Sequence, residues 1–241
     1  RSMSEKIIII GSSGAIGSAF VDFYKSQNPN NFIYSLSRSN PESDVGNNKN
    51  FFIDFENEAS ISEAAAFCSN DGPFDKVIIT TGILHQDEIN PEKSYRGLQK
   101  NNMDKIFSIN TFGPTIAARY FIPLLRKDEK SFLGLLSARV GSISDNKIGG
   151  WYSYRSSKAA LNMIIKSLSI EVARNNKNLI IAGLHPGTVD SNLSSPFQSN
   201  VPDGKLFTPK YSVECLAKVI DNLEQKDSGN IFAWDGQRID F

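Results

Sequence analysis

Residues 6–17 have the sequence KIIIIGSSGAIG, in which four consecutive isoleucines are followed at once by a glycine-rich segment. A short, continuous β-branched run of this kind is typical of a strand buried on both faces of a parallel sheet. Residues 14–27 then carry apolar side chains at near-helical spacing. The segment therefore predicts a strand, a tight turn and a helix in immediate succession.

Short apolar runs and longer amphipathic stretches alternate along the rest of the chain. Pro114 and Pro123 should kink or end one of the helical stretches, because proline cannot donate a backbone hydrogen bond. Strands that alternate with helices indicate an α/β chain with a doubly wound parallel sheet and helices on both faces. The pattern predicts further strands at 31–37, 49–55, 76–80, 131–137, 178–184 and 229–234, and helices at 61–67, 103–125, 153–174 and 211–223.

No linker or internal repeat divides the 241 residues, and a chain of this length can form one α/β domain. We expect a single domain over residues 5–241. Residues 1–4 are expected to be a tag remnant and a disordered N-terminus, because two residues precede the first methionine. The polar stretch 39–50 is expected to be a mobile surface connection, and the stretch at about 191–207 a lid over a binding site.

The composition argues against several classes of protein. Lys and Arg number 26, as do Asp and Glu, and this zero net charge argues against a general nucleic-acid binder. Two cysteines without a CxxC motif and only two histidines argue against a disulfide scaffold and a metal site. No apolar run approaches the roughly 18 residues of a membrane span, and we see no signal-peptide segment, so we expect a cytoplasmic protein without membrane contact.

The glycine-rich segment has the context of a dinucleotide-binding turn. Gly11 would permit the tight turn, Gly14 would let the backbone approach a pyrophosphate, and Gly17 would allow close packing of helix on strand. The free N–H groups and the dipole of a helix N-terminus favour anionic phosphates. A glycine-rich turn without a ligand is the alternative, but the strand before it and the helix after it favour the dinucleotide. We therefore expect a single-domain Rossmann fold.

Two residues at strand ends bear on which dinucleotide binds. Arg38 stands where an acidic residue would hold the ribose 2′-hydroxyl of NAD, and arginine instead accommodates the 2′-phosphate of NADP. We therefore expect NADP (NADPH) in preference to NAD, the alternative being a solvated surface arginine. Asp54 could accept a hydrogen bond from the adenine amino group, or it could be a turn aspartate.

Tyr154 and Lys158 form a YxxxK motif on the predicted helix 153–174, where a separation of four residues places both side chains on one face. A tyrosine with a pKa near ~10 is a poor acid or base at neutral pH, and a nearby ammonium would lower that pKa. Chance pairs of this kind are common in helices. Asn110 stands inside another predicted helix, where it either kinks the backbone and holds an ordered water or is simply exposed.

Together these residues resemble the short-chain dehydrogenase/reductase family, over about residues 5–236. Three segments, SARVGSI (137–143), GGWYSYR (149–155) and FAWDG (232–236), look like its branch of C-factor-type and sniffer-like carbonyl reductases. The motifs that carry the family resemblance are the glycine turn at 11–17, Asp54, Thr80 to Gly82, Asn110, the block 137–158 and Pro186-Gly187.

The resemblance implies a catalytic set of four residues. Asn110 would hold a water in a proton relay, Ser137 would orient the substrate carbonyl, and Tyr154 would donate the proton. Lys158 would bind the nicotinamide ribose and lower the tyrosine pKa, and hydride would pass from the cofactor to the carbonyl carbon. The cofactor-binding residues that it implies are Gly11, Ser13, Gly14, Ile16, Gly17, Arg38, Asp54, Phe55, Thr81, Gly82, Lys158, Pro186, Gly187 and Val189.

The chain departs from the family pattern at three places. The glycine spacing is GxxGxxG, as in the extended members, with Ala15 at the usual middle glycine. The segment 79–82, ITTG, replaces the usual Asn-Asn-Ala-Gly. Ala138 stands where the family has its catalytic serine, so Ser137 and Ser142 are both candidates for that hydroxyl.

The leading hypothesis is an NADPH-dependent reductase of a small carbonyl compound, with Tyr154 as general acid/base. The displaced serine motivates an alternative, a nucleotide-binding, C-factor-like signalling or regulatory protein with little catalysis. The glycine spacing motivates a third, an epimerase or dehydratase, which the chain length opposes. The resemblance also implies a homodimer or homotetramer, and the helix 153–174 has enough apolar positions to cover both a sheet and a partner.

Overall fold

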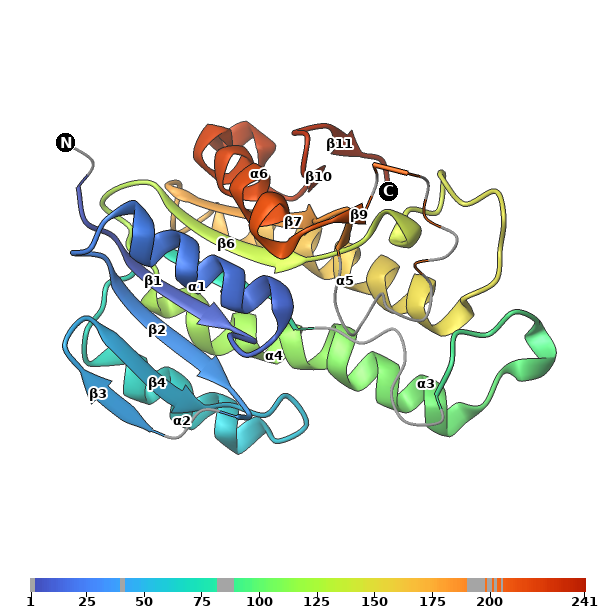
Figure 1. Cartoon of the computed structure of the whole chain (residues 1–241), viewed down its shortest axis with the longest axis horizontal. Coiled ribbons are helices and arrows are strands. Elements are labelled where there is room, and N and C mark those ends of the chain that lie inside the picture. The colour runs from blue at the N-terminus through green and yellow to red at the C-terminus, as the bar shows by residue number, and fades with distance from the viewer. Residues whose placement is uncertain are drawn as a thin grey trace.

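The computed structural model describes residues 3–39, 42–81, 89–189, 198, 201, 203–204 and 206–241 (Figure 1). Arg1 and Ser2, Gly82 and most of the expected lid at 191–207 lie outside the described residues. Strands and helices alternate along the described chain, which confirms the predicted α/β class.

A nine-stranded sheet runs through the described part of the chain, in the order β11-β10-β7-β6-β5-β1-β2-β4-β3. Neighbouring strands are parallel except at the two edges, where β3 and β11 are antiparallel to their neighbours. The order reverses between β1 and β5, and ligands of open α/β sheets bind beyond the carboxyl ends of strands at such a point. The strands are β1 Lys6–Ile10, β2 Phe32–Ser37, β3 Ser43–Val45, β4 Asn48–Phe52, β5 Lys76–Ile79, β6 Ser131–Leu136, β7 Leu179–His185, β10 Ile231–Ala233 and β11 Arg238–Ile239.

Helices cover both faces of the sheet (Figure 1). Helices α1 (Ala15–Gln27) and α6 (Pro209–Asn222) pack on one face, in a core that contains Ile7 and Ile9 of β1. Ile8 and Ile10 enter the core on the other face, because successive side chains of a strand point to opposite sides. The core on this other face is covered by α2 (Glu58–Ser69), α4 (Gly113–Phe121) and α5 (Tyr152–Val172). This arrangement confirms the predicted Rossmann fold.

The single helix predicted over 103–125 is divided into parts. Helix α3 (Lys100–Phe107) is followed by a π-helical turn, η2 (Ser108–Phe112), then by α4, and the 3-10 turn η3 (Ile122–Leu124) ends the series. The prolines lie in the first turns of α4 and η3, the positions of a helical segment at which proline is best tolerated. A π-helical turn inside a helix frequently marks a functional site, and this one contains Asn110.

Several short strands lie where the sequence predicts none. Strand β3 occupies the polar stretch that was expected to be a mobile connection, and it pairs with β4. Strand β11 pairs with β10, and β8 (Thr188–Val189) pairs with β9 (Leu206–Phe207) in a separate two-stranded sheet. A strand of two or three residues carries too few side chains to show a period of two, so pattern reasoning misses it.

The described ranges contain no helix that is both long enough and apolar enough to cross a bilayer. Nor, within the same ranges, do three His, Cys, Asp or Glu side chains gather as a metal site.

Candidate active site

The glycine turn joins β1 to α1 beside the point where the strand order reverses. Gly11 has φ +89°, and a Cβ there would lie 2.7 Å from Thr80 Oγ1. A Cβ on Gly17 would lie 2.0 Å from the Gly11 carbonyl oxygen, so α1 can approach the turn only with glycine at that position. A Cβ on Gly14 would meet the same oxygen at 3.4 Å, which is an ordinary contact. The fold thus requires Gly11 and Gly17, whereas Gly14 leaves space in the cleft that it lines.

The N-terminus of α1 is suited to an anion. The helix has no side-chain cap and no acidic residue in its first turn. The N–H groups of a first helical turn have no partner inside the helix, and the dipole adds a partial positive charge. Ser13 lines the cleft at this end, and Ile16 packs partly against the core under α1. The turn therefore fits a pyrophosphate.

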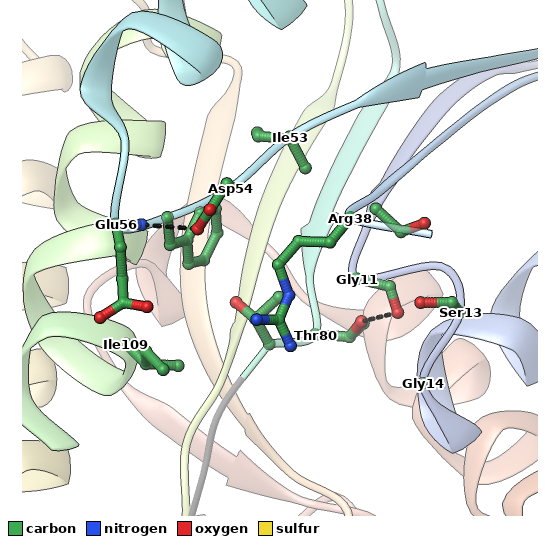
Figure 2. A pocket seen from close by; sticks show the side chains of 12 residues that line it. Gly11, Ser13, Gly14, Arg38, Ile53, Asp54, Glu56, Thr80 and Ile109 are labelled. Atoms are coloured by element: carbon green, nitrogen blue, oxygen red, sulfur yellow. Dashed lines mark hydrogen bonds between the residues drawn. The ribbon is translucent and has the colours of Figure 1, made fainter. Parts of the chain in front are cut away.

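Figure 2 shows the cleft, which has a volume of about 230 Å³ and lies at the carboxyl ends of β1, β2, β4 and β5. The side chain of Arg38 extends into it. Among the described residues, no carboxylate forms an ion pair with this guanidinium. Phe55, Thr80 and Thr81 also line the cleft. An arginine free of a carboxylate partner is suited to bind a phosphate group.

Asp54 both holds a turn and lines the cleft. Its Oδ1 accepts a hydrogen bond from the Glu56 N–H at 3.0 Å, which leaves the second carboxylate oxygen available. Both interpretations of Asp54 are therefore compatible with the geometry. The sequence analysis did not single out Glu56, which lines the same cleft and pairs with Lys105 of α3 at 2.7 Å. The sequence signal that could have identified Glu56 is its position two residues after Asp54, in the same turn between a strand and a helix.

Tyr154 and Lys158 lie one turn apart on α5 and are both buried. Lys158 Nζ donates to the Leu136 carbonyl oxygen at 3.0 Å and lies 5.9 Å from the centre of the Tyr154 ring. Burial lowers the pKa of Lys158 to about 8 and raises the pKa of Tyr154 to about 12. The lysine was expected to lower the tyrosine pKa, but burial raises that pKa instead, because removal of water disfavours the charged phenolate. Tyr154 is thus a protonated phenol at neutral pH.

Asn110 is fully buried in η2, so the exposed alternative is wrong. Its Nδ2 donates to Ser157 Oγ at 3.2 Å, and the Thr111 hydroxyl donates to the Ser157 carbonyl oxygen at 2.7 Å. Because Ser157 directly precedes Lys158, these bonds fasten the π-helical turn beside the turn of α5 that carries the YxxxK motif.

Ser137 does not present a free hydroxyl beside Tyr154. It is buried, and its Oγ–H donates at 2.6 Å to Oδ1 of Asn162, a residue of α5 that the sequence analysis did not single out. Ala138 packs against Tyr154 instead, because successive residues of an extended segment point to opposite sides. Ser142 is buried as well, and its hydroxyl accepts a hydrogen bond from the Asp145 N–H at 3.2 Å.

The segment after β7 lies at the same edge of the sheet. Gly187 has φ +77°, and a Cβ there would lie 2.6 Å from the Phe207 ring. The Ser212 hydroxyl of α6 donates to the Pro186 carbonyl oxygen at 2.7 Å, and Val189 is buried in β8. These contacts fix the chain just beyond the strand end, where the sequence predicts cofactor contacts.

The sequence of the chain matches that of a known enzyme family. Residues 5–202 match the model of the short chain dehydrogenase family. The chain therefore belongs to the short-chain dehydrogenase family and is an oxidoreductase of the class that uses a nicotinamide cofactor.

Two relatives in sequence illustrate the range of the family. The 1-hydroxy-2-glutathionyl-2-methyl-3-butene dehydrogenase of Rhodococcus sp. (strain AD45) is 32% identical over 185 residues, which are 76% of each chain. The C-signal of Myxococcus xanthus is 33% identical over 138 residues, which are 57% of this chain and 78% of that protein.

Two solved structures confirm the fold. The NADPH-bound carbonyl reductase from chicken fatty liver has a TM-score of 0.83 at 22% identity and covers 100% of this chain and 96% of its own. The carbonyl reductase Sniffer of D. melanogaster has a TM-score of 0.83 at 19% identity and covers 99% of this chain and 100% of its own. The relatives and these structures agree with the resemblance to C-factor-type and sniffer-like proteins.

Proposed function

We propose that this protein is an NADPH-dependent oxidoreductase that transfers hydride to a small carbonyl substrate, with Tyr154 as general acid/base. The observation that carries the proposal is the buried, protonated Tyr154 one helical turn from Lys158. Both residues belong to the family's catalytic motif, and the glycine turn lies at the carboxyl ends of the strands in the sheet that α5 covers. The names of the dehydrogenase from Rhodococcus and of the NADPH-bound carbonyl reductase support this reaction class.

The residues present fit a nicotinamide dinucleotide. Gly14 leaves space beside the turn, and the uncapped N-terminus of α1 would hold the pyrophosphate. Arg38, which extends into the cleft, would hold the 2′-phosphate, and this supports NADP over NAD. When bound, the cofactor supplies the hydride. The other proposed contacts are Gly11, Ser13, Ile16, Gly17, Asp54, Phe55, Thr81, Gly82, Lys158, Pro186, Gly187 and Val189.

Each catalytic side chain then has a distinct task. Tyr154 donates its phenolic proton to the carbonyl oxygen, and burial keeps that proton in place until it is needed. The Lys158 ammonium favours the phenolate that remains and would bind a ribose hydroxyl. Asn110, held in the π-helical turn, would bind the water through which the proton is replaced. Ser137, expected to orient the substrate carbonyl, would instead hold the segment after β6 to α5 through its hydrogen bond to Asn162.

The test compares Tyr154→Phe with Tyr152→Phe in NADPH oxidation by a panel of aldehydes and ketones. The first change removes only the phenolic oxygen and should lower kcat by about 10²- to 10⁴-fold, the usual contribution of a general acid. The second removes the same atom from a half-exposed side chain on the same turn and should leave kcat unchanged. Full activity of Tyr154→Phe would refute the mechanism.

A nucleotide-binding signalling or regulatory protein with little catalysis is the second candidate. Ala138, which packs against Tyr154 where the family has a hydroxyl, favours it, as does the similarity to the C-signal. This alternative predicts tight binding of NADPH in calorimetry together with no turnover of any carbonyl in the panel.

A further inference from the structure

Glu92 places a buried carboxylate against the N-terminus of α5. The residue is only 7% exposed, and within the described ranges no lysine, arginine or histidine forms an ion pair with it. Burial of an unpaired carboxylate is costly unless hydrogen bonds offset the lost hydration. Among the described residues, the groups that bond to Glu92 lie at the start of α5.

Three hydrogen bonds join Glu92 to that helix. The Ser153 N–H donates to Oε2 at 3.2 Å, and the Ser153 hydroxyl donates to Oε1. The Trp151 N–H donates to the Glu92 carbonyl oxygen at 2.6 Å. Trp151 is the N-cap residue of α5 and forms no side-chain cap of its own. Glu92, which lies 61 residues before Ser153, therefore caps the helix in its place.

The backbone at this point is held in an uncommon conformation. Trp151 has φ 51°, and it is the one non-glycine residue of the described chain with a positive φ. Such a conformation persists where the surroundings fix it. The Trp151 ring stands edge-on to the Tyr154 ring, with centroids 6.3 Å apart. The hydrogen bond between Trp151 and Glu92 thus helps to fix the position of the Trp151 ring, which packs against Tyr154.

We propose that Glu92 is a positioning residue, which caps α5 and thereby fixes the place of the Tyr154 hydroxyl. Tyr154 is the third residue of α5, so any shift of the first turn moves it directly. The inference rests on the proposed function for its catalytic consequence, because a reacting group misplaced by about 1 Å can lose about 100-fold in rate.

The test compares three variants of the full chain in kcat and in the dissociation constant for NADPH. Glu92→Ala should lower kcat by about 10- to 100-fold and leave NADPH affinity unchanged, because the cap lies outside the cleft. Glu92→Gln should keep most of the activity, since an amide offers an acceptor to the Ser153 N–H and a donor to its hydroxyl. Asp227→Ala removes a carboxylate cap from the 3-10 turn Gln225–Asp227 and should leave kcat unchanged.

Hydrogen exchange of the amides of residues 152–155 gives a readout that needs no turnover. Exchange should be faster in Glu92→Ala and close to wild type in Glu92→Gln. The proposal would be overturned if Glu92→Ala kept the wild-type kcat or the wild-type exchange rates. It would also be overturned if Glu92→Gln lost as much kcat as Glu92→Ala while its α5 amides stayed protected from exchange. If the wild type turned over no carbonyl, the proposed function would fail, and exchange would still decide whether Glu92 holds this turn.

Discussion

Single residues at the site owe their chemistry to burial as much as to their neighbours. Spacing alone predicts that Tyr154 and Lys158 share a helix face, and the structure agrees. Spacing cannot predict the direction of the tyrosine pKa, because that depends on how much water the fold removes. It also cannot predict that the hydroxyl of Ser137 bonds to Asn162, since that partner comes from a distant part of the chain.

The pKa of Lys158 makes stability depend on pH. The pKa falls from 10.5 in the unfolded chain to about 8 in the folded one, so between these values the unfolded chain binds more protons. The free energy of unfolding therefore rises as the pH rises through this window. Lys158→Met should be more stable relative to wild type at pH 8 than at pH 10, and urea denaturation at both values measures the difference. A difference independent of pH would contradict the prediction.

Arg38→Ala should weaken NADPH binding selectively. A hydrogen bond to a charged group contributes about 1.5–3 kcal/mol, so the dissociation constant for NADPH should rise by about 10- to 100-fold. NADH has no 2′-phosphate and serves as the internal control, with an affinity that stays near that of the wild type. Calorimetric titration of both nucleotides checks this, and an equal loss for both would show that Arg38 does not bind the 2′-phosphate.

Elements with a strong pattern could be predicted from the sequence, and elements with a weak pattern could not. The isoleucine run of β1 and the long amphipathic helix α5 were predicted to within one or two residues. The π-helical turn was not, because a single turn of five residues is too short to show a periodic pattern of its own. Strand β3 has only three residues, Ser43–Val45, at a sheet edge, where pairing with β4 decides the conformation.

The turn between β1 and α1 gives a prediction at the scale of an element. Gly17→Ala places a Cβ against the Gly11 carbonyl oxygen and should destabilise the fold by about 1–3 kcal/mol, the usual cost of overpacking. Gly14→Ala meets no such obstacle and has an extended backbone, so it should fold normally. It should nevertheless bind NADPH more weakly, because the new methyl group lines the cleft.

Thermal unfolding and calorimetry on the two glycine variants separate these effects. Equal loss of stability in both variants would show that Gly14 is needed by the fold, and the argument that it makes room for a ligand would fail.

The whole molecule brings distant parts of the sequence to one edge of the sheet. The glycine turn follows β1, Arg38 follows β2, Asp54 follows β4 and Pro186 follows β7. Parallel strands make this convergence unavoidable, since their carboxyl ends share one edge. The order of motifs along the chain was therefore enough to predict that these residues gather at one edge of the sheet, although it could not predict the caps and bonds that orient α5.

We predict that the molecule is a homodimer or homotetramer. Met163 and Ile170 are 66% and 53% exposed and lie seven residues apart, so they share one outer face of α5. Apolar residues on such a face are suited to a second copy of the chain. Light scattering should show an oligomer, and Met163→Glu should shift it toward the monomer. A single monomeric species of the wild type at micromolar concentration would overturn this.

Transfer of a label from cofactor to product tests the central claim most directly. NADPH carrying deuterium at nicotinamide C4 would be incubated with the wild type and a panel of small carbonyl compounds, and the alcohols would be analysed by mass spectrometry. We predict deuterium on the former carbonyl carbon of at least one product, formed about 10²- to 10⁴-fold more slowly with Tyr154→Phe. Tight NADPH binding with no label in any product would contradict the reductase and favour the signalling protein.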